Sequence, residues 1–223
     1  MKNYQRRLQQ ATLLTSILLL SGLTCFGFTA EGKSTFVRLQ FGKDVSIEVP
    51  RNWYFLDQNI RQHLNTYSET VAKLSGIDVN QGNNQILIAA NAYSNDKKPS
   101  ASMRLSVRGI ADACPSQTEL KFTDLSKMRR DVELNIRKLN KSLPDNVKNI
   151  ELIDVRLERI GKYYTLVTEQ QIDFVYGPAF DRLDVICVGN KNFKLYTSYQ
   201  KAEAWMFEPI IRYIRKSLAI YPQ

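Results

Sequence analysis

The feature that most constrains the fold is a series of four strand-like segments with very short connections in the C-terminal half of the sequence. Apolar and polar residues alternate within them, as Ile153, Val155 and Leu157 show for the first. Strands joined by so few residues pair antiparallel, because a parallel pair needs a crossover of about a dozen residues or more. The four segments span residues 150–160, 162–174, 180–188 and 192–199.

Further periodic segments surround this series. Alternation on both sides of Gly42 predicts a β-hairpin. Strands are expected at residues 35–41, 45–49, 85–93 and 102–108. Apolar residues spaced three and four apart predict amphipathic helices at residues 60–74, from between Ser116 and Thr123 to Leu139, and at 201–219. Pro209 is expected in the first turn of the last helix.

The order of these elements predicts the fold class. Strands outnumber helices, and three amphipathic helices need a sheet to cover. No repeat or Pro/Ser-rich linker divides residues 31–223. We therefore predict a single α+β domain over residues 31–223, in which one antiparallel β-sheet is flanked by helices as an α/β/α sandwich.

The first 30 residues have the pattern of an export signal. Residues 1–10 carry three cations and no acid, and residues 11–28 carry no charge and precede small residues that end at Ala30. A basic start, an apolar middle and a small-residue exit are typical of a secretory signal peptide. We predict cleavage after Ala30 and a periplasmic or secreted protein.

Two alternatives keep the exported domain attached to the membrane. Residues 11–28 are just long enough to span a bilayer as an uncleaved anchor. The sequence Leu23-Thr24-Cys25 loosely resembles a lipobox, which would make Cys25 a lipidation site. Contact with a membrane is expected only through one of these two routes.

The charge balance favours an ordinary solvated surface. The chain has 31 Lys and Arg against 22 Asp and Glu, a net charge of +9. Removal of residues 1–30 takes away three cations and leaves 28 against 22, a net charge of +6. The cations alternate with acids and form no block of five or more, so we expect no nucleic-acid partner.

Cysteine content gives one structural prediction. Removal of the signal would also remove Cys25 and leave Cys114 and Cys187. In an oxidising compartment these two have one possible intramolecular pairing. Closing a loop of about 70 residues would stabilise the fold by roughly 4 kcal/mol. We predict a Cys114–Cys187 disulfide, and the alternative is two separate buried thiols.

Two segments of the sequence resemble a known family. Val45-Ser46-Ile47-Glu48-Val49-Pro50-Arg51-Asn52-Trp53 joins a strand to a Pro-x-x-Trp motif, and residues 193–199 lead into a helix that ends Tyr213-Ile214-Arg215-Lys216-Ser217-Leu218. Both segments resemble PsbP/Mog-type proteins, including bacterial DcrB-like exported domains, over about residues 35–220. The resemblance implies an α/β/α sandwich and an accessory or binding role, and it brings no catalytic residues with it. Trp53 is expected to pack over the sheet edge, with stacking on a ligand as the alternative.

The sequence offers little material for a reactive centre. His63 is the one histidine of the chain and no nucleophile motif accompanies it, so we expect a surface or rim residue. No phosphate-binding glycine loop or calcium loop is present, and we predict neither a cofactor nor a metal site. An acid pair for hydrolysis need not be local in sequence. A periplasmic hydrolase whose site is assembled from distant residues therefore stays an alternative.

Tyrosines and basic residues gather in the C-terminal third. Aromatic rings beside cations favour a recognition surface, although tyrosines also fit half-buried strands. The candidate partner-surface residues are Lys194, Tyr196, Tyr199, Arg212 and Arg215.

Together these features predict an exported, non-enzymatic accessory or binding protein of the bacterial cell envelope that contacts an unknown envelope protein. Besides the hydrolase, one more alternative is a small apolar ligand held in a sealed cavity between the sheet and a helix.

Overall fold

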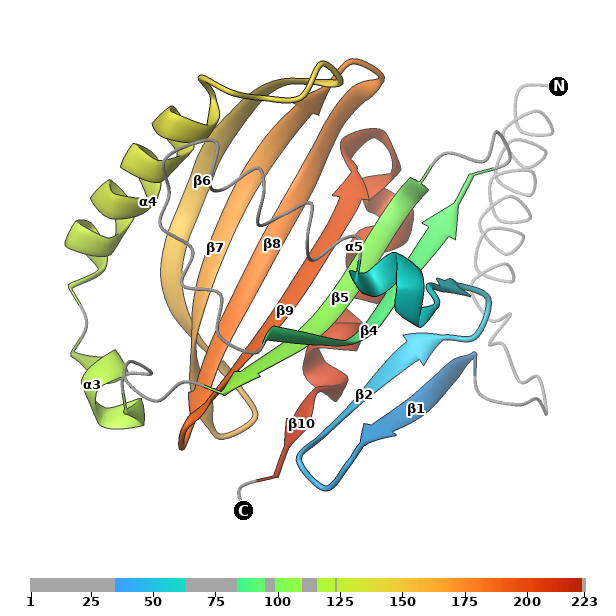
Figure 1. Ribbon diagram of the computed structural model, residues 1–223, viewed down its shortest axis with the longest axis vertical. Coiled ribbons are helices and arrows are strands. Elements are labelled where there is room, and N and C mark those ends of the chain that lie inside the picture. The colour runs from blue at the N-terminus through green and yellow to red at the C-terminus, as the bar shows by residue number, and fades with distance from the viewer. Residues whose placement is uncertain (1–34, 63–83, 95–98, 110–115, 123, 222–223) are drawn as a thin grey trace, which may run out of the picture. The chain divides into compact units, whose positions relative to one another are not determined.

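A seven-stranded antiparallel sheet forms the centre of the protein, with the strand order β3-β4-β5-β9-β8-β7-β6 (Figure 1). The computed structural model describes residues 35–62, 84–94, 99–109, 116–122 and 124–221. In chain order, the strands of this sheet are β3 (Tyr54–Phe55), β4 (Asn84–Tyr93), β5 (Pro99–Gly109), β6 (Val147–Ile160), β7 (Tyr163–Phe174), β8 (Gly177–Val188) and β9 (Lys191–Gln200).

The four C-terminal strands form the antiparallel meander that their short connections predict. Neighbouring strands pair in register, from Ile160 opposite Tyr163 to Val188 opposite Lys191. Gly161 and Gly189, in two of the tight turns, both have a φ of 57°, a left-handed conformation that glycine adopts without strain. Glycine at these two positions therefore lets long strands follow one another almost without a loop.

The N-terminal hairpin forms a second, smaller sheet. Strands β1 (Phe36–Phe41) and β2 (Val45–Pro50) pair as predicted, and β10 (Ala219–Ile220) adds to the free edge of β2. The expectation of one sheet was therefore wrong. The physical reason is burial on both sides of β2, where Val45, Ser46, Ile47 and Val49 are at most 1% exposed. Such a strand lies inside the domain, between other layers, and its remaining edge pairs with the chain end.

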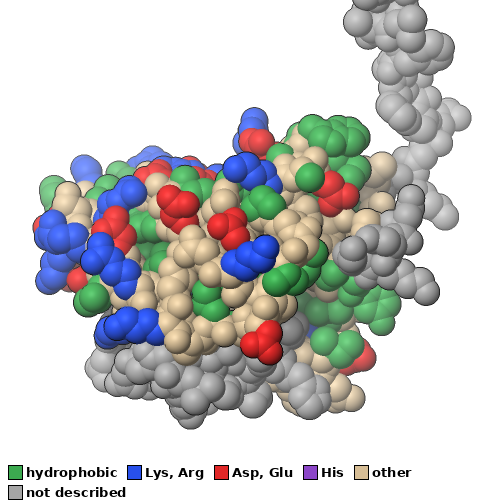
Figure 2. Space-filling model, turned by 90° about the horizontal axis from the view of Figure 1, so that it is seen from above, with side chains coloured by type: hydrophobic (Ala, Val, Ile, Leu, Met, Phe, Trp, Pro, Cys, Tyr) green, Lys and Arg blue, Asp and Glu red, His purple; other side chains and the backbone are tan. Residues whose placement is uncertain are grey.

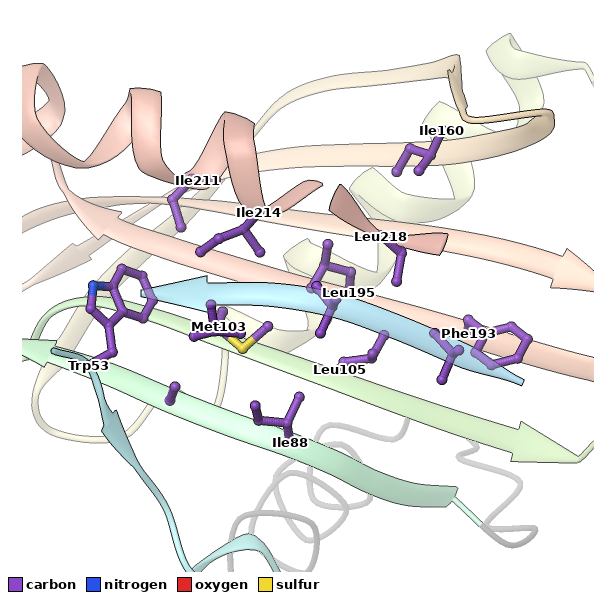
Figure 3. Packing of buried hydrophobic residues seen from close by; sticks show 14 of the residues in the cluster. Trp53, Ile88, Met103, Leu105, Ile160, Phe193, Leu195, Ile211, Ile214 and Leu218 are labelled. Carbon is purple, nitrogen blue, oxygen red and sulfur yellow. The ribbon is translucent and has the colours of Figure 1, made fainter. Parts of the chain in front are cut away.

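The hydrophobic core lies between the main sheet, the hairpin and helix α5 (Ala204–Ser217), which lies behind the sheet in Figure 1. Figure 3 shows side chains of α5 directed toward those of β5 and β9. The largest buried contributions include Met103, Leu105, Ile186, Phe193, Leu195 and Ile214. Trp53 is 4% exposed, and its ring lies edge-on to Phe207 with 6.3 Å between centroids. The prediction that Trp53 packs in the fold is confirmed.

Two helices occupy the region where one was predicted before β6. Helix α3 (Gln117–Lys121) begins with a capping box between Ser116 and Glu119. Helix α4 (Leu125–Leu139) begins at its own cap, Asp124, whose side chain accepts from the backbone of Lys127. Two independent N-terminal caps start two helices instead of one. Helix α4 runs along β6 in Figure 1, so helices flank the sheet as in the predicted α+β sandwich.

Helix α5 differs from its prediction at Pro209. A 3₁₀ turn, η2 (Lys201–Glu203), leads directly into Ala204, so Pro209 lies inside the helix instead of in its first turn. Proline cannot donate to the carbonyl of Trp205 one turn earlier. Trp205 is 80% exposed, which leaves that side of the helix open to water. The missing hydrogen bond is therefore tolerated.

Two further expectations concern the helices. Most of the predicted helix at 60–74 lies outside the described residues. Residues 58–62, which the structure describes, are helical. Among the helices that the structure describes, none combines the length and the apolar character needed to cross a membrane.

Candidate functional site

The sheet face beneath α5 changes character from one half to the other. On β5 and β9 this face carries apolar residues such as Leu105 and Leu195, which are fully buried. On β6, β7 and β8 the same face carries charges. Side chains at paired positions of neighbouring strands share a face, and Glu169 on β7 pairs with Arg182 on β8. With Arg215 of α5, these residues form what we call the charged cluster: Arg156, Glu158, Glu169, Arg182, Asp184 and Arg215.

Arg215 ties the helix to the sheet. Its Nε donates to Asp184 Oδ2 at 2.8 Å, and its Nη2 donates to Asp184 Oδ1 at 2.6 Å and to Glu158 Oε2 at 2.7 Å. Burial lowers the pKa of the Arg215 guanidinium, but hydrogen bonds and charges of the two carboxylates outweigh it and raise the pKa above its usual value. The bidentate hydrogen bonds to Asp184, which is 0% exposed, therefore fix α5 over β8.

Arg156 and Arg182 complete the cluster. Arg156 donates from Nε to Glu158 Oε1 at 2.7 Å, and from Nη1 and Nη2 to the two oxygens of Glu169 at 2.6 and 2.9 Å. Arg182 Nη2 donates to Glu169 Oε1. Burial raises the pKa of Glu158, but hydrogen bonds from Arg215 and Arg156 outweigh it and hold that pKa below its usual value. Every carboxylate oxygen in the cluster thus accepts from an arginine.

A cavity of about 600 Å³ lies between α5 and the charged cluster, and we call it the α5 cavity. Helix α5 contributes residues spaced three and four apart, namely Glu208, Ile211, Arg212, Arg215 and Lys216. The sheet contributes the rings of Phe180 and Tyr199, whose centroids are 5.7 Å apart, and the polar side chains of Arg182 and Thr197. The volume lies in the range of about 300–1,000 Å³ that is typical of ligand pockets.

The five residues predicted as a partner surface lie on both faces of the sheet. Tyr199, Arg212 and Arg215 line the α5 cavity. Lys194 and Tyr196 point to the other face, because side chains alternate along β9 and the intervening Leu195 belongs to the core. The structure brings three of the five together, and their role toward a partner stays a prediction.

Tyr196 makes an internal contact on that opposite face. Its hydroxyl donates to the carboxylate of Asp181, which is 3% exposed. Burial raises the pKa of Asp181, although hydrogen bonds from Ser198 and Tyr196 act against it. Burial and the nearby Asp181 charge raise the pKa of Tyr196 well above its usual value. Tyr196 is thus placed as a buried hydrogen-bond donor.

Several predicted residues lie outside the described part of the chain: residues 1–30 with Cys25, His63 and Cys114. Cys187 is buried on β8, at 5% exposed. Gln117, three positions after Cys114, donates from Nε2 to the Cys187 carbonyl at 2.9 Å. The segment that follows Cys114 therefore reaches Cys187, and the disulfide itself stays a prediction.

Sequence reasoning missed most of the charged cluster. Arg156 and Glu158 are two apart on β6, as Arg182 and Asp184 are on β8, so each pair shares one face of its strand. That signal was present in the sequence, but alternating charges on a strand are typical of a solvated face. Nothing local to these strands indicates that a distant helix covers them.

On the face in Figure 2, Lys and Arg side chains are interspersed with Asp and Glu. Within the described ranges, no group of three or more His, Cys, Asp and Glu side chains is arranged to hold a metal ion. The α5 cavity is therefore the candidate site.

Comparison of the sequence with protein-family models and with curated proteins gives no match. Among solved structures, the protein is similar to cyanobacterial PsbP (CyanoP) of Synechocystis, with 11% identity, a TM-score of 0.52, and coverage of 89% of this chain and 99% of that chain. LpqN of Mycobacterium tuberculosis, involved in cell envelope biogenesis, is similar at 10% identity and a TM-score of 0.47, covering 84% and 91% of the two chains. The Ran-binding protein Mog1p of Saccharomyces cerevisiae is similar at 7% identity and a TM-score of 0.40, covering 84% and 96%.

The similarity to CyanoP extends over nearly all of both chains and concerns the fold alone. It agrees with the antiparallel sheet flanked by helices that the strand order and Figure 1 show. The protein therefore has the PsbP/Mog-type α/β/α sandwich fold that the Pro-x-x-Trp motif and the C-terminal pattern predict.

Proposed function

We propose that the protein is an exported accessory protein of the bacterial cell envelope and that it binds a ligand or a partner segment in the α5 cavity. The observation that carries this proposal is the cavity itself, about 600 Å³ with an ordered charged wall and an aromatic wall. Side chains held by several hydrogen bonds lose little further freedom when a ligand binds. The side chains of the charged cluster are therefore already held in place before a ligand binds.

The chemistry of the carboxylates supports binding over hydrolysis. A carboxyl that acts as a general acid needs a raised pKa and a proton to give. The pKa of Glu158 is instead held below its usual value, and both of its oxygens accept from arginines. Glu169 and Asp184 are engaged in the same way. These groups suit a fixed electrostatic wall better than proton transfer.

Export is supported by the sequence of residues 1–30 and by the two cysteines that would remain after cleavage. The contact of Gln117 with the Cys187 carbonyl supports the Cys114–Cys187 disulfide. Fractionation of cells followed by thiol titration without reductant tests both proposals. We expect the protein in the periplasmic or secreted fraction with no free thiol. A cytoplasmic protein would contradict export, and two free thiols would contradict the disulfide.

Site-specific photocrosslinking in the native envelope tests the binding role. A photoreactive phenylalanine analogue replaces Tyr199 in the α5 cavity, and the matched control replaces Tyr93, which is 47% exposed at the end of β4. We expect one reproducible adduct, identified by mass spectrometry, from position 199 and none from position 93. Identical adduct patterns at the two positions, or no adduct at position 199, would contradict a binding role for the cavity.

A further inference from the structure

We propose that the α5 cavity binds an amphiphilic anion, a molecule with one carboxylate or phosphate head and a short apolar body. This inference rests on the proposed function, because it names the ligand chemistry of the same cavity. It is carried by the hydrogen-bond donors that the cavity lining leaves unused.

Most carboxylate oxygens around the cavity are already occupied. Both oxygens of Glu158, Glu169 and Asp184 accept hydrogen bonds from arginines of the charged cluster. Glu208, at the helix side, accepts from Arg212 at 2.7 Å. Among the described residues of the lining, the carboxylate oxygens without a partner are Glu208 Oε2, at the exposed helix side, and Asp181 Oδ1, on the Tyr196 side of β8. At the charged cluster itself, a cationic ligand would have to displace an arginine.

The donors, in contrast, are in excess. Arg182 has one hydrogen-bonded partner among the described residues, Glu169, and reaches it through Nη2. Its Nε and Nη1 are therefore available to a ligand. Lys216 has no hydrogen-bond or ion-pair partner within the described ranges. Arg212 uses only Nη2 among the described residues, toward Glu208, so its Nε and Nη1 are unused as well. Three cationic side chains thus reach the cavity with unused donors.

Thr197 adds a buried polar group to the same wall. It is 1% exposed, and its Oγ1 has no hydrogen-bond partner in the part of the chain that the structure describes. Thr197 pairs with Arg182 across β8 and β9, so hydroxyl and guanidinium lie side by side on the cavity face. A buried hydroxyl without a partner costs free energy, which a ligand oxygen would recover.

Electrostatics favours a negative head at this point. Burial lowers the pKa of Arg182. The charges of Arg215 and Arg156 act in the same direction, and those of Asp184 and Glu158 act against it. An anion beside Arg182 would offset this repulsion. A charge-assisted hydrogen bond to a guanidinium is roughly twice as strong as a neutral one.

The apolar body of the ligand is inferred from the apolar part of the lining. Phe180 and Tyr199 lie two positions along β8 and β9 from Arg182 and Thr197, and with Ile211 of α5 they form an apolar wall beside the free donors. An anion without an apolar part would leave this wall in contact with water, and burying apolar surface contributes roughly 25 cal/mol per Å². The lining therefore favours an amphiphile over inorganic phosphate.

Isothermal titration of the protein purified after export tests the proposal with four ten-carbon probes and inorganic phosphate. We expect decanoate or decyl phosphate to bind, and comparison of the two identifies the preferred head. Decanol and decyltrimethylammonium should bind at least tenfold more weakly, and inorganic phosphate likewise. Equal binding of decanol, or tighter binding of the ammonium probe, would overturn the anionic head.

Three variants assign the binding to the cavity. The double variant Arg212→Gln/Lys216→Gln should weaken binding of the preferred probe at least tenfold, and the near-isosteric Thr197→Val about threefold. Lys127→Gln, at an exposed position on α4, is the matched control and should bind like the unmodified chain. The exposure of Arg212 and Lys216 makes both substitutions compatible with folding. Unchanged binding in the double variant would overturn the proposal.

The photocrosslinking experiment separates this inference from the proposed function. An adduct at position 199 together with no binding of decanoate or decyl phosphate would refute the anionic amphiphile and leave the binding role intact. No adduct and no probe binding would refute both.

Discussion

Two halves of one sheet face perform different physical tasks beneath the same helix. Under β4, β5 and β9 the face is apolar, and residues such as Met103, Leu105 and Leu195 are fully buried against α5 and the N-terminal hairpin. On β6, β7 and β8 part of the same face is charged, and a cavity remains between that part and α5, while Ile160 and Ile186 farther along β6 and β8 belong to the core. We infer that the first half mainly provides stability and that the second half holds the proposed site.

Helix α5 serves both halves because its two stripes are adjacent. Phe207, Ile211 and Ile214 are buried at spacings of four and three and face the core, as Figure 3 shows for the last two. Arg212 and Lys216 follow one and two positions later and line the cavity. A helix anchored by its apolar stripe can therefore hold charged side chains at fixed positions without their contributing much to stability.

The largest expected effect lies in the apolar half. Phe193→Ala removes a ring that is 2% exposed, and we expect the free energy of unfolding to fall by about 3–5 kcal/mol. Trp205→Ala is the matched control, because Trp205 is 80% exposed and its loss should cost no more than about 0.5 kcal/mol. Denaturant unfolding measures both. Similar losses in the two variants would contradict the assignment of the core.

The second effect lies at the boundary between the halves. Asp184→Asn leaves the guanidinium of Arg215 buried with a weaker partner, and we expect a loss of about 3 kcal/mol by the same measurement. The double variant Asp184→Leu/Arg215→Met should recover most of it, because an apolar pair needs no compensation for buried charge. A double variant as unstable as Asp184→Asn would show that the ion pair itself is required.

The third prediction concerns acid stability. The folded-state pKa of Glu158 is below the ordinary value of 4.5, so its ionised form contributes stability that is complete above about pH 4.5 and is lost as the pH falls through the folded pKa. Glu158→Gln should therefore flatten the decline in stability between about pH 4.5 and pH 3. The check is a series of denaturant unfolding curves across that range. If the stability of Glu158→Gln declined in acid as steeply as that of the unmodified protein, the hydrogen bonds from Arg156 and Arg215 would be contradicted.

The smallest effect is expected on the other face of β8. The pKa of Asp181 is raised above 3.8, so its ionised form costs stability as the pH rises through the folded value. Asp181→Asn should make the protein more stable at pH 7 and bring no gain below about pH 3.8. Thermal unfolding at the two pH values measures this sign. A gain in acid and a loss at pH 7 would mean that Asp181 is stabilised as an anion.

Strand periodicity allowed much of the fold to be predicted, because a half-buried strand repeats its apolar residues every second position. The same rule separates Tyr196 from Tyr199, which are an odd number of residues apart on β9. The predicted partner surface combined them because proximity in sequence was given more weight than strand geometry. Strand geometry places Tyr196 and Tyr199 on opposite faces, and the packing of α5 determines which face holds the cavity.

The charged cluster could not be predicted from the sequence for a different reason. Arg215 and Asp184 are 31 positions apart and meet only because α5 folds back over β8. The placement of the hairpin depends likewise on β10, two residues that pair with β2 from the far end of the chain. Such contacts follow from tertiary packing, and the local pattern does not contain them.

The most direct test of the division between the two halves is a titration of the exported, isotope-labelled protein with decanoate, followed by amide chemical shifts. We predict that the largest shifts occur at Arg182, Thr197 and Arg212, around the α5 cavity, while the amides of Met103 and Leu105 stay unchanged. Shifts of equal size at Met103 and Leu105, or no shift at Arg182 and Thr197, would contradict the assignment of binding to the charged half and of stability to the apolar half.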